Sequence, residues 1–421
     1  MKVENVICTF CGCLCDDIQV TVEDGEIKKV LRACVTGRNK ILGYNKNLAR
    51  CRVDGKEASL KEAADAAGEI LNKSNHPLIY GLSSTSCEAQ REAVELAELT
   101  GASIDSTASV CHAPGALARQ MVGLPTCTLG EVKNRADLIV YWGCNPAEAH
   151  LRHASRYAVT PKGMFVPEGR KGRHVVVVDV RVTPTVKMAD THVQIKPGYD
   201  YECLATLRAL LAGEKIECDE VGGMPLSELE DLVEKMRGCR YGALFFGMGL
   251  TMSSGKQNNV MEAIELVRDL NKYTRFCVIP MRGHGNVAGV EQTLSWLTGF
   301  PFAINFSKGY PRYGPGEYTA VDLLVREEVD AALIIASDPA AHFPGKAVDY
   351  LRRIPTIVID CHENLTTELA RVVIPSAPVG IAAEGTAYRM DNVPLRLKQL
   401  VTSPHSPDTR ILEMLKERIV C

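Results

Sequence analysis

The sequence predicts an α/β protein in which short, fully buried strands alternate with amphipathic helices. Two observations support this fold class. Eight apolar runs rich in Val and Ile lack the alternation of a half-exposed strand, which is typical of parallel sheets covered on both faces. Helical patterns lie between these runs, as doubly wound sheets require. The predicted strands are residues 77–82, 137–143, 174–180, 241–247, 275–280, 331–337, 355–360 and 371–375.

Three helices have clear signatures in the sequence. Ser59 and Glu62 form a capping box, and the apolar residues that follow recur on one helical face. Thr85 and Glu88 show the same pattern at the start of a second helix. The third helix is expected over residues 257–271. We detect no internal repeat and no low-complexity tract.

Composition limits the classes of function. The chain has 421 residues and a net charge of −3, so it shows no bias toward nucleic acid. It has no apolar signal-like start and no run of about 18 apolar residues, so we expect a cytoplasmic protein without a membrane span. Its 16 cysteines are then metal ligands and buried thiols rather than disulfides. The basic stretch 161–174 is either a solvated insertion or a contact for a subunit or substrate.

Four cysteines near the start of the chain have the spacing C-x2-C-x3-C-x18-C. They are Cys8, Cys11, Cys15 and Cys34. Thiolates at this spacing can hold a 4Fe–4S cluster. A structural zinc site and plain core thiols are the alternatives, but zinc sites usually use two well-separated ligand pairs. The crowding of three sulfurs in one turn therefore favours the cluster.

The other cysteines leave part of this ligand set open. Cys13 lies in the same turn and becomes a ligand only if it replaces a neighbour. Cys51 competes with Cys34 for the last position. Core packing is the better interpretation for the scattered thiols of Cys87, Cys203, Cys218, Cys239 and Cys277.

Glycine and polar residues follow several predicted strands. Any single group is explained as a turn, but groups at consecutive strand ends favour an extended ligand with phosphates and a base. Asp179 could pair with the N–H edge of a guanine. The chain has no G-x-G-x-x-G and no Walker A motif, which disfavours a simple dinucleotide or ATP site. The strand-end groups are residues 143–146, 179–181, 247–249 and 337–339.

Cys111, His112 and Arg282 carry the candidate chemistry. Cys111 lies at a loop or a helix start, where its thiolate is stabilised and can bind a soft metal. His112 can move a proton beside that metal, and the planar cation of Arg282 fits a carboxylate. An isolated Cys-His pair can also be purely structural. A Cys-His hydrolase is disfavoured because no orienting Asn or Asp is evident.

Taken together, these segments resemble a known family. The stretches CTFCGCLCDDI, SVCHAPG and MRGHGNVAG, with others in the same order, resemble the molybdenum/tungsten bis-pterin oxidoreductases. The resemblance is strongest to the catalytic B subunits of formylmethanofuran dehydrogenase. It covers nearly the whole chain.

The resemblance implies a role for each matching residue. Cys8, Cys11, Cys15 and Cys34 would hold the 4Fe–4S cluster, and Cys111 would bind molybdenum or tungsten. His112 would relay protons and Arg282 would orient the substrate. Two pterin guanine dinucleotides would be lined by Gly143, Asn145, His150, Asp179, Arg181, Gly198, Asp200, Gly247, Gly249, Gly283, Glu384, Gly385 and Thr386.

The resemblance also implies a domain plan of the formate dehydrogenase type that lacks the C-terminal β-barrel. A small Fe–S domain would span 1–55, and a segment 376–421 would pack back near it. Residues 56–105 with 284–375 would form one dinucleotide-binding domain, and 106–283 the second, which carries Cys111. Thr36 stands where related formate dehydrogenases have a lysine, so another group would have to bridge cluster and pterin.

The implied activity is reversible two-electron reduction of CO2 to formate. Formate would pass to a metallohydrolase-type subunit that joins it to methanofuran. Ferredoxin-like subunits would supply electrons, and a β-barrel subunit would complete the pterin site. A stand-alone formate dehydrogenase and a non-catalytic Fe–S electron-transfer or scaffold subunit are the alternatives. The sequence does not distinguish molybdenum from tungsten.

Overall fold

The computed structural model describes residues 1–420 and divides the chain into two compact units. The first unit contains Met1–Val110, His284–Arg389 and the residues from Pro394 onward. The second contains Cys111–Gly283 and Met390–Val393. The chain therefore leaves the first unit after Val110 and returns to it after Gly283. The finer division into four segments remains a prediction.

A nine-stranded sheet forms the centre of the first unit. Its middle strands are parallel, and antiparallel strands of two residues extend both edges. The strand order is β16 (Arg312–Tyr313), β15 (Ile304–Asn305), β7 (Ser103–Ser106), β6 (Pro77–Gly81), β17 (Ala331–Ile335), β18 (Thr356–Asp360), β19 (Val372–Pro375), β4 (Arg52–Val53) and β5 (Lys56–Glu57).

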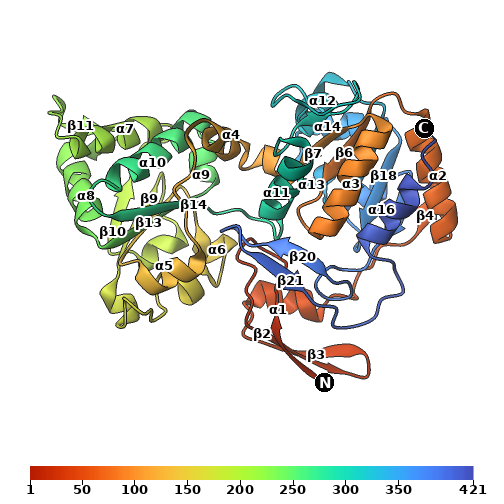
Figure 1. Cartoon of the computed structure of the whole chain (residues 1–421), viewed down its shortest axis with the longest axis horizontal. Coiled ribbons are helices and arrows are strands. Elements are labelled where there is room, and N and C mark those ends of the chain that lie inside the picture. Colours follow the sequence, from red (N-terminus) through yellow and green to blue (C-terminus); the bar gives the residue numbers. More distant parts are fainter. Residues whose placement is uncertain (421) are drawn as a thin grey trace. The chain divides into compact units, whose positions relative to one another are not determined.

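Helices cover both faces of this sheet because successive side chains of each buried strand point to opposite faces. Ile79 and Leu333 pack on one face against helices that include α3 and α16, whereas Leu78 and Ile334 pack on the other. Figure 1 shows α3 and α16 side by side on the same face of the sheet. The longer helices are α2 (Leu60–Lys73), α3 (Cys87–Thr100), α11 (Val287–Thr298), α12 (Ala320–Arg326), α14 (Gly345–Leu351) and α16 (Asp408–Lys416), and the shorter are α13 (Pro339–His342), α15 (Leu365–Leu369) and the 3-10 turn η1 (Thr107–Val110).

The first unit also contains two small antiparallel sheets. One joins β1 (Lys2–Val6), β2 (Ile18–Glu23) and β3 (Glu26–Leu31) and leads into helix α1 (Val35–Leu42). The other is the pair β20 (Gly385–Tyr388) and β21 (Pro394–Leu397). The cysteine-rich turn lies between β1 and β2.

The second unit is built on a parallel five-stranded sheet. Its strand order is β10 (Thr191–Gln194), β9 (His174–Asp179), β8 (Leu138–Trp142), β13 (Tyr241–Phe246) and β14 (Arg275–Pro280). The remaining elements are α4 (Ala113–Val122), α5 (Leu129–Arg135), α6 (Pro146–Ala149), η2 (Ala154–Ala158), η3 (Gly169–Gly172), η4 (Pro184–Met188), α7 (Asp200–Leu211), β11 (Glu220–Val221), β12 (Met224–Pro225), α8 (Leu226–Gly238), α9 (Met248–Thr251) and α10 (Gln257–Leu270).

All eight predicted strands are present, and the mixed α/β class is confirmed. The capping box at Ser59 is also confirmed, since its hydroxyl accepts from the N–H of Glu62 and the Glu62 carboxylate accepts in return. The capping box predicted at Thr85 is wrong. Ser86 caps α3 instead, and the Glu88 carboxylate accepts from Thr386. No helix within residues 1–420 combines the length and apolar character needed to cross a membrane.

Candidate active site and cofactor cradle

Four of the N-terminal thiols gather where the cysteine-rich turn meets helix α1. Cys34 is the N-cap of α1, and its sulfur accepts from the N–H of Gly37 at 3.3 Å. A Cβ on Gly37 would lie 2.9 Å from the sulfur of Cys8, so only glycine lets that sulfur approach the first helical turn. Burial raises the pKa of Cys8, and the neighbouring thiols of Cys15, Cys11 and Cys34 raise it further.

The two other cysteines of this region, Cys13 and Cys51, have different surroundings. The Cys13 thiol donates to the sulfur of Cys11, which lowers the pKa of Cys11 to about 7 and raises that of Cys13. Cys13 therefore supports a neighbouring sulfur. Cys51 packs against the core of the nine-stranded sheet instead, where burial raises the pKa of its thiol.

In the second unit, glycines bring two strand-end turns into backbone contact. Gly143 follows β8 in the left-handed region, with φ +56°, and its carbonyl accepts from the N–H of Gly249 at 2.9 Å. A Cβ on Gly249 would lie 2.7 Å from the Cα of Gly143. A Cβ on Gly247 would lie 2.6 Å from the Cβ of Cys144. The glycines are therefore required by packing, whatever ligand these turns bind.

Cys111 and His112 immediately precede helix α4. The Cys111 carbonyl accepts from the hydroxyl of Thr251 at 2.7 Å, which fixes the backbone there. His112 is 2% exposed, and its Nε2 lies 3.1 Å from the carbonyl of Met281 at the end of β14. The next residue, Arg282, is also 2% exposed. The structure therefore brings the start of α4 next to the backbone that carries Arg282.

His150 links a second strand end to the same place. It is buried at the end of α6, and its Nε2 lies 2.8 Å from the carbonyl of Arg282. Burial lowers the pKa of His150, so its imidazole is neutral at pH 7 and can donate to that carbonyl. A guanidinium nitrogen of Arg282 donates to the carbonyl of Met390 at 3.5 Å. A Cβ on Gly283 meets no atom within 4 Å, so packing does not require that glycine.

The remaining residues expected in the second unit also follow strands or begin helices. The Trp142 indole donates to the Asp200 carboxylate at 2.9 Å, and burial raises the pKa of Asp200. Asp179 at the end of β9 accepts from the N–H of Arg181 at 3.3 Å, and burial raises its pKa too. Gly198 adopts φ +87°. The edge thus presents carboxylates and glycine turns, which suit the amide edge of a base and a phosphate chain.

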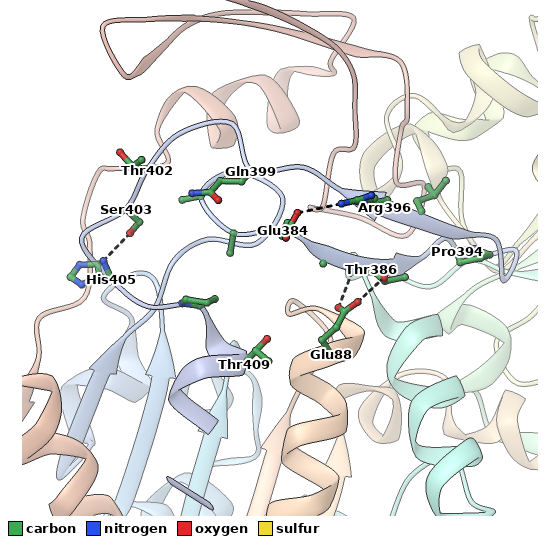
Figure 2. A pocket seen from close by; sticks show the side chains of 15 residues that line it. Glu88, Glu384, Thr386, Pro394, Arg396, Gln399, Thr402, Ser403, His405 and Thr409 are labelled. Atoms are coloured by element: carbon green, nitrogen blue, oxygen red, sulfur yellow. Dashed lines mark hydrogen bonds and ion pairs between the residues drawn. The ribbon is translucent and has the colours of Figure 1, made fainter. Parts of the chain in front are cut away.

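In the first unit, Glu384, Gly385 and Thr386 line an open cavity of about 870 Å³. Thr386 donates to the carboxylate of Glu88 through its N–H at 2.9 Å and its hydroxyl at 2.8 Å, as Figure 2 shows. A Cβ on Gly385 would lie 2.6 Å from the Cβ of Ser86, so β20 crosses the start of α3 at close range. The carboxylate of Glu384 faces Arg396 at 3.7 Å.

The two units contain the same strand-end turn. The Thr185 hydroxyl donates to the side-chain oxygen of Asn145 at 2.6 Å, and the Thr366 hydroxyl donates to that of Asp338 at 2.6 Å. In each case a proline follows the Asn or Asp. The N–H of the residue after that proline donates to the threonine hydroxyl. The distance is 3.2 Å from Ala147 to Thr185 and 3.0 Å from Ala340 to Thr366.

The neighbouring strands repeat as well. Thr191 pairs with Val176 in β10 and β9, and Val372 pairs with Ile357 in β19 and β18. Both members of the second pair stand 181 positions after those of the first (372 minus 191, and 357 minus 176). The two units therefore share a structural repeat, although no internal repeat is detectable in the amino-acid sequence.

The repeat identifies further candidate site residues that were not predicted from the sequence. Asp360 ends β18 as Asp179 ends β9, and it accepts from the N–H of His362 at 3.0 Å, again two residues later. Cys361 lies between them. The only sequence signal was an Asn or Asp before Pro-Ala, three residues after a strand. Within residues 1–420, Asp360, Cys361 and His362 form a group whose three potential metal-ligand atoms all lie within 4.8 Å of one another.

Comparison with solved structures defines the class of protein. Acetylene hydratase from Pelobacter acetylenicus matches with a TM-score of 0.74 at 11% identity, covering 99% of this chain and 69% of that one. The formyltransferase/hydrolase complex FhcABCD from Methylorubrum extorquens, solved with methylofuran, contains a chain that matches with a TM-score of 0.71 at 23% identity. That match covers 87% of this chain and 97% of the other. By fold, the chain belongs with these α/β proteins.

Sequence comparison gives the family. The B subunit of the tungsten-containing formylmethanofuran dehydrogenase 2 of Methanocaldococcus jannaschii is 49% identical, over 99% of this chain and 98% of the relative. The corresponding B subunit from Methanococcus maripaludis is 43% identical over the same shares. No family model matches the chain. The chain belongs to the family of formylmethanofuran dehydrogenase B subunits, whose enzymes are oxidoreductases.

Proposed function

We propose that this chain is the catalytic subunit of a formylmethanofuran dehydrogenase. In this proposal it reduces CO2 reversibly to formate, with two electrons and one proton consumed for each CO2. The reaction takes place at molybdenum or tungsten held by two pterin guanine dinucleotides. The observation that carries the proposal is the duplicated strand-end turn in a chain with full-length relatives of this family.

The residues at the two strand-end edges fit such a group. The turns around Gly143 and Gly249 contact each other backbone to backbone at the strand-end edge, where α/β sheets bind ligands. Asp179 and Asp360 each end a strand at the matching position, where a carboxylate can accept from the amide edge of a guanine. Two copies of one recognition turn suit a cofactor that contains two similar halves.

Cys111, His112 and Arg282 would then form the reacting end of the site. A thiolate before the first turn of α4 is stabilised by the positive end of the helix dipole, and sulfur is a suitable ligand for a soft metal. The metal, when bound, supplies two-electron redox chemistry. Buried Arg282 favours a small anion such as formate, and His112, held by the carbonyl of Met281, would hold or move the proton.

The N-terminal thiols would carry electrons one at a time. Burial makes thiolates at Cys8 and Cys15 costly without a bound cation, which suits a metal site. Of these sulfurs, all within the described residues, no three lie within 4.8 Å of one another, as the ligands of a single ion would. A 4Fe–4S cluster instead holds its cysteine ligands on four outer corners, farther apart. Cys34 is the fourth ligand in this proposal because it adjoins Cys8 at Gly37, whereas Cys51 does not.

The protein would work in a multi-subunit enzyme. The two relatives in this family are described as subunits, and the Fhc likeness comes from a complex. We propose a metallohydrolase-type subunit that joins formate to methanofuran, ferredoxin-like subunits that deliver electrons, and a β-barrel subunit against the pterins. Copurification of the native complex, followed by identification of its subunits, tests this part separately.

Replacing Cys111 by Ala tests the catalytic assignment. CO2 reduction by the purified complex should fall below detection, while the EPR signal of the 4Fe–4S cluster should stay unchanged. Cys203→Ala is the matched control because Cys203 is a buried thiol in the same unit that donates to the carbonyl of Val221. Turnover that survives in Cys111→Ala would remove Cys111 as the metal ligand. Iron without molybdenum or tungsten in the native complex would favour a non-catalytic role.

A further inference from the structure

Cys127 and Cys277 form a close pair of thiols in the second unit. Their sulfurs lie 3.1 Å apart, and both cysteines are free. A disulfide has an S–S length of about 2.05 Å, so bond formation requires a movement of roughly 1 Å. From the sequence, Cys277 was predicted to be a core-packing thiol, and Cys127 had no predicted role. Neither thiol belongs to the residues proposed for the cofactor.

The backbone around the pair allows that movement on one side. Cys277 is in β14, the edge strand of the sheet, which pairs with β13 along its length. Cys127 lies between the end of α4 and the start of α5, outside any helix or strand. The carbonyl of Pro125 accepts from the N–H of Val278 at 2.9 Å, which keeps this connection beside β14. Cys127 can therefore shift toward a strand that stays in place.

The pair is accessible from a cavity of about 400 Å³. Cys127 is half-buried, whereas Cys277 is 3% exposed. Both thiols line the cavity together with Tyr241, Arg268 and Arg275. A cavity of this size admits a small molecule. Cys127 is therefore the more exposed of the two thiols to a reagent in the cavity.

The two thiols also differ in acidity. The hydrogen bond between the two thiols lowers the pKa of Cys127, and the same bond together with burial raises the pKa of Cys277. Thiolates rather than thiols attack disulfides. The sulfur that the solvent reaches is thus also the better nucleophile, and the buried sulfur is placed to act second.

We propose that Cys127 and Cys277 form a thiol–disulfide exchange site for a low-molecular-weight disulfide. The Cys127 thiolate attacks one sulfur of that disulfide, forms a mixed disulfide and releases the other half as a thiolate. Cys277 then attacks the Cys127 sulfur, an internal disulfide forms, and the second half leaves as a thiol with the Cys277 proton. The protein loses two electrons, and the small disulfide gains them. The site operates independently of CO2 reduction.

Peptide mapping after exposure to oxidised glutathione tests the proposal. The purified complex is incubated anaerobically with oxidised glutathione, and remaining thiols are blocked with N-ethylmaleimide before digestion. We expect a cross-linked peptide pair containing Cys127 and Cys277, and its loss after treatment with dithiothreitol. Recovery of both residues alkylated after prolonged exposure would overturn the proposal, because the pair would then be only a packing contact.

Variants separate the roles of the two sulfurs. Cys277→Ser should stop the reaction at a mixed disulfide, with glutathione attached to Cys127. Cys239→Ser is the matched control, because Cys239 is a half-buried thiol of the same unit that donates to the carbonyl of Met236. It should form the internal disulfide at the wild-type rate. Glutathione on Cys239 but not on Cys127 would contradict the proposal, and if Cys277→Ser fails to fold, the wild-type map still decides.

Discussion

Replacing Gly143 by Ala tests the close crossing of the two strand-end turns in the second unit. With φ +56°, the left-handed conformation costs a residue other than glycine roughly 1–2 kcal/mol. The added Cβ would also lie 2.7 Å from the nitrogen of Leu250 and 2.9 Å from the carbonyl carbon of Gly249. Both are backbone atoms that cannot rotate away, and overpacking of this kind costs about 1–3 kcal/mol. The free energy of unfolding should therefore fall by roughly 2–5 kcal/mol.

Gly213→Ala isolates the backbone part of this effect. Gly213 belongs to the same unit and has φ +85°, but a Cβ there meets no atom within 4 Å. It should lose only about 1–2 kcal/mol. Urea unfolding followed by tryptophan fluorescence is the assay, because buried Trp142 directly precedes Gly143. Equal losses in the two variants, within about 0.5 kcal/mol, would refute the close approach of the two turns.

Three further predictions concern single contacts. Ser86→Ala should cost about 1 kcal/mol in urea unfolding, because its hydroxyl caps α3, whereas Thr85→Ser should cost less. Glu363→Gln should lower the free energy of unfolding by about 1.5–3 kcal/mol at pH 7, because Arg52 holds the pKa of the Glu363 carboxyl at about 2. A carboxyl whose pKa is lowered on folding stabilises the protein above its usual pKa of 4.5. The difference in stability between variant and wild type should therefore vanish as the pH falls through 2. Burial lowers the pKa of His153 to about 3, so the free energy of unfolding should fall on acidification from pH 6.5 toward 3. His153→Gln should reduce the slope of the free energy of unfolding against pH in this range by up to about 1.4 kcal/mol per pH unit.

The parallel strands could be predicted because burial on both faces leaves a continuous apolar run. The edge strands could not, since β4, β5, β15 and β16 have two residues each and no periodicity to detect. The error at Thr85 has a tertiary cause. Both Thr85 and Ser86 are residues that cap helices, and Glu88 stands at the right spacing for Thr85. The Glu88 carboxylate, however, accepts hydrogen bonds from Thr386, which is distant in sequence.

The candidate site was predictable where its residues are close in the chain. The spacing of Cys8, Cys11 and Cys15 is a local signal, and the structure gathers them as expected. The hydrogen bond from Cys13 to Cys11 depends on side-chain direction within one turn, which spacing does not specify. The duplicated turn was missed because few residue identities recur, and the match emerges only from strand register and hydrogen-bond partners.

The duplicated strand-end turn has parts that recur in both units and parts that differ between them. The carboxylate that ends the strand and the N–H two residues later recur in both units, but the side chains do not: Arg181 stands where His362 follows in the copy. Burial and the nearby cation of Lys40 lower the pKa of His362, so it is neutral at pH 7, whereas Arg181 is always charged. Lys40 and Lys46 line a cavity of about 720 Å³ beside His362. The positive charge that a phosphate ligand needs would therefore come from the strand-end turn in the second unit and from these lysines in the first.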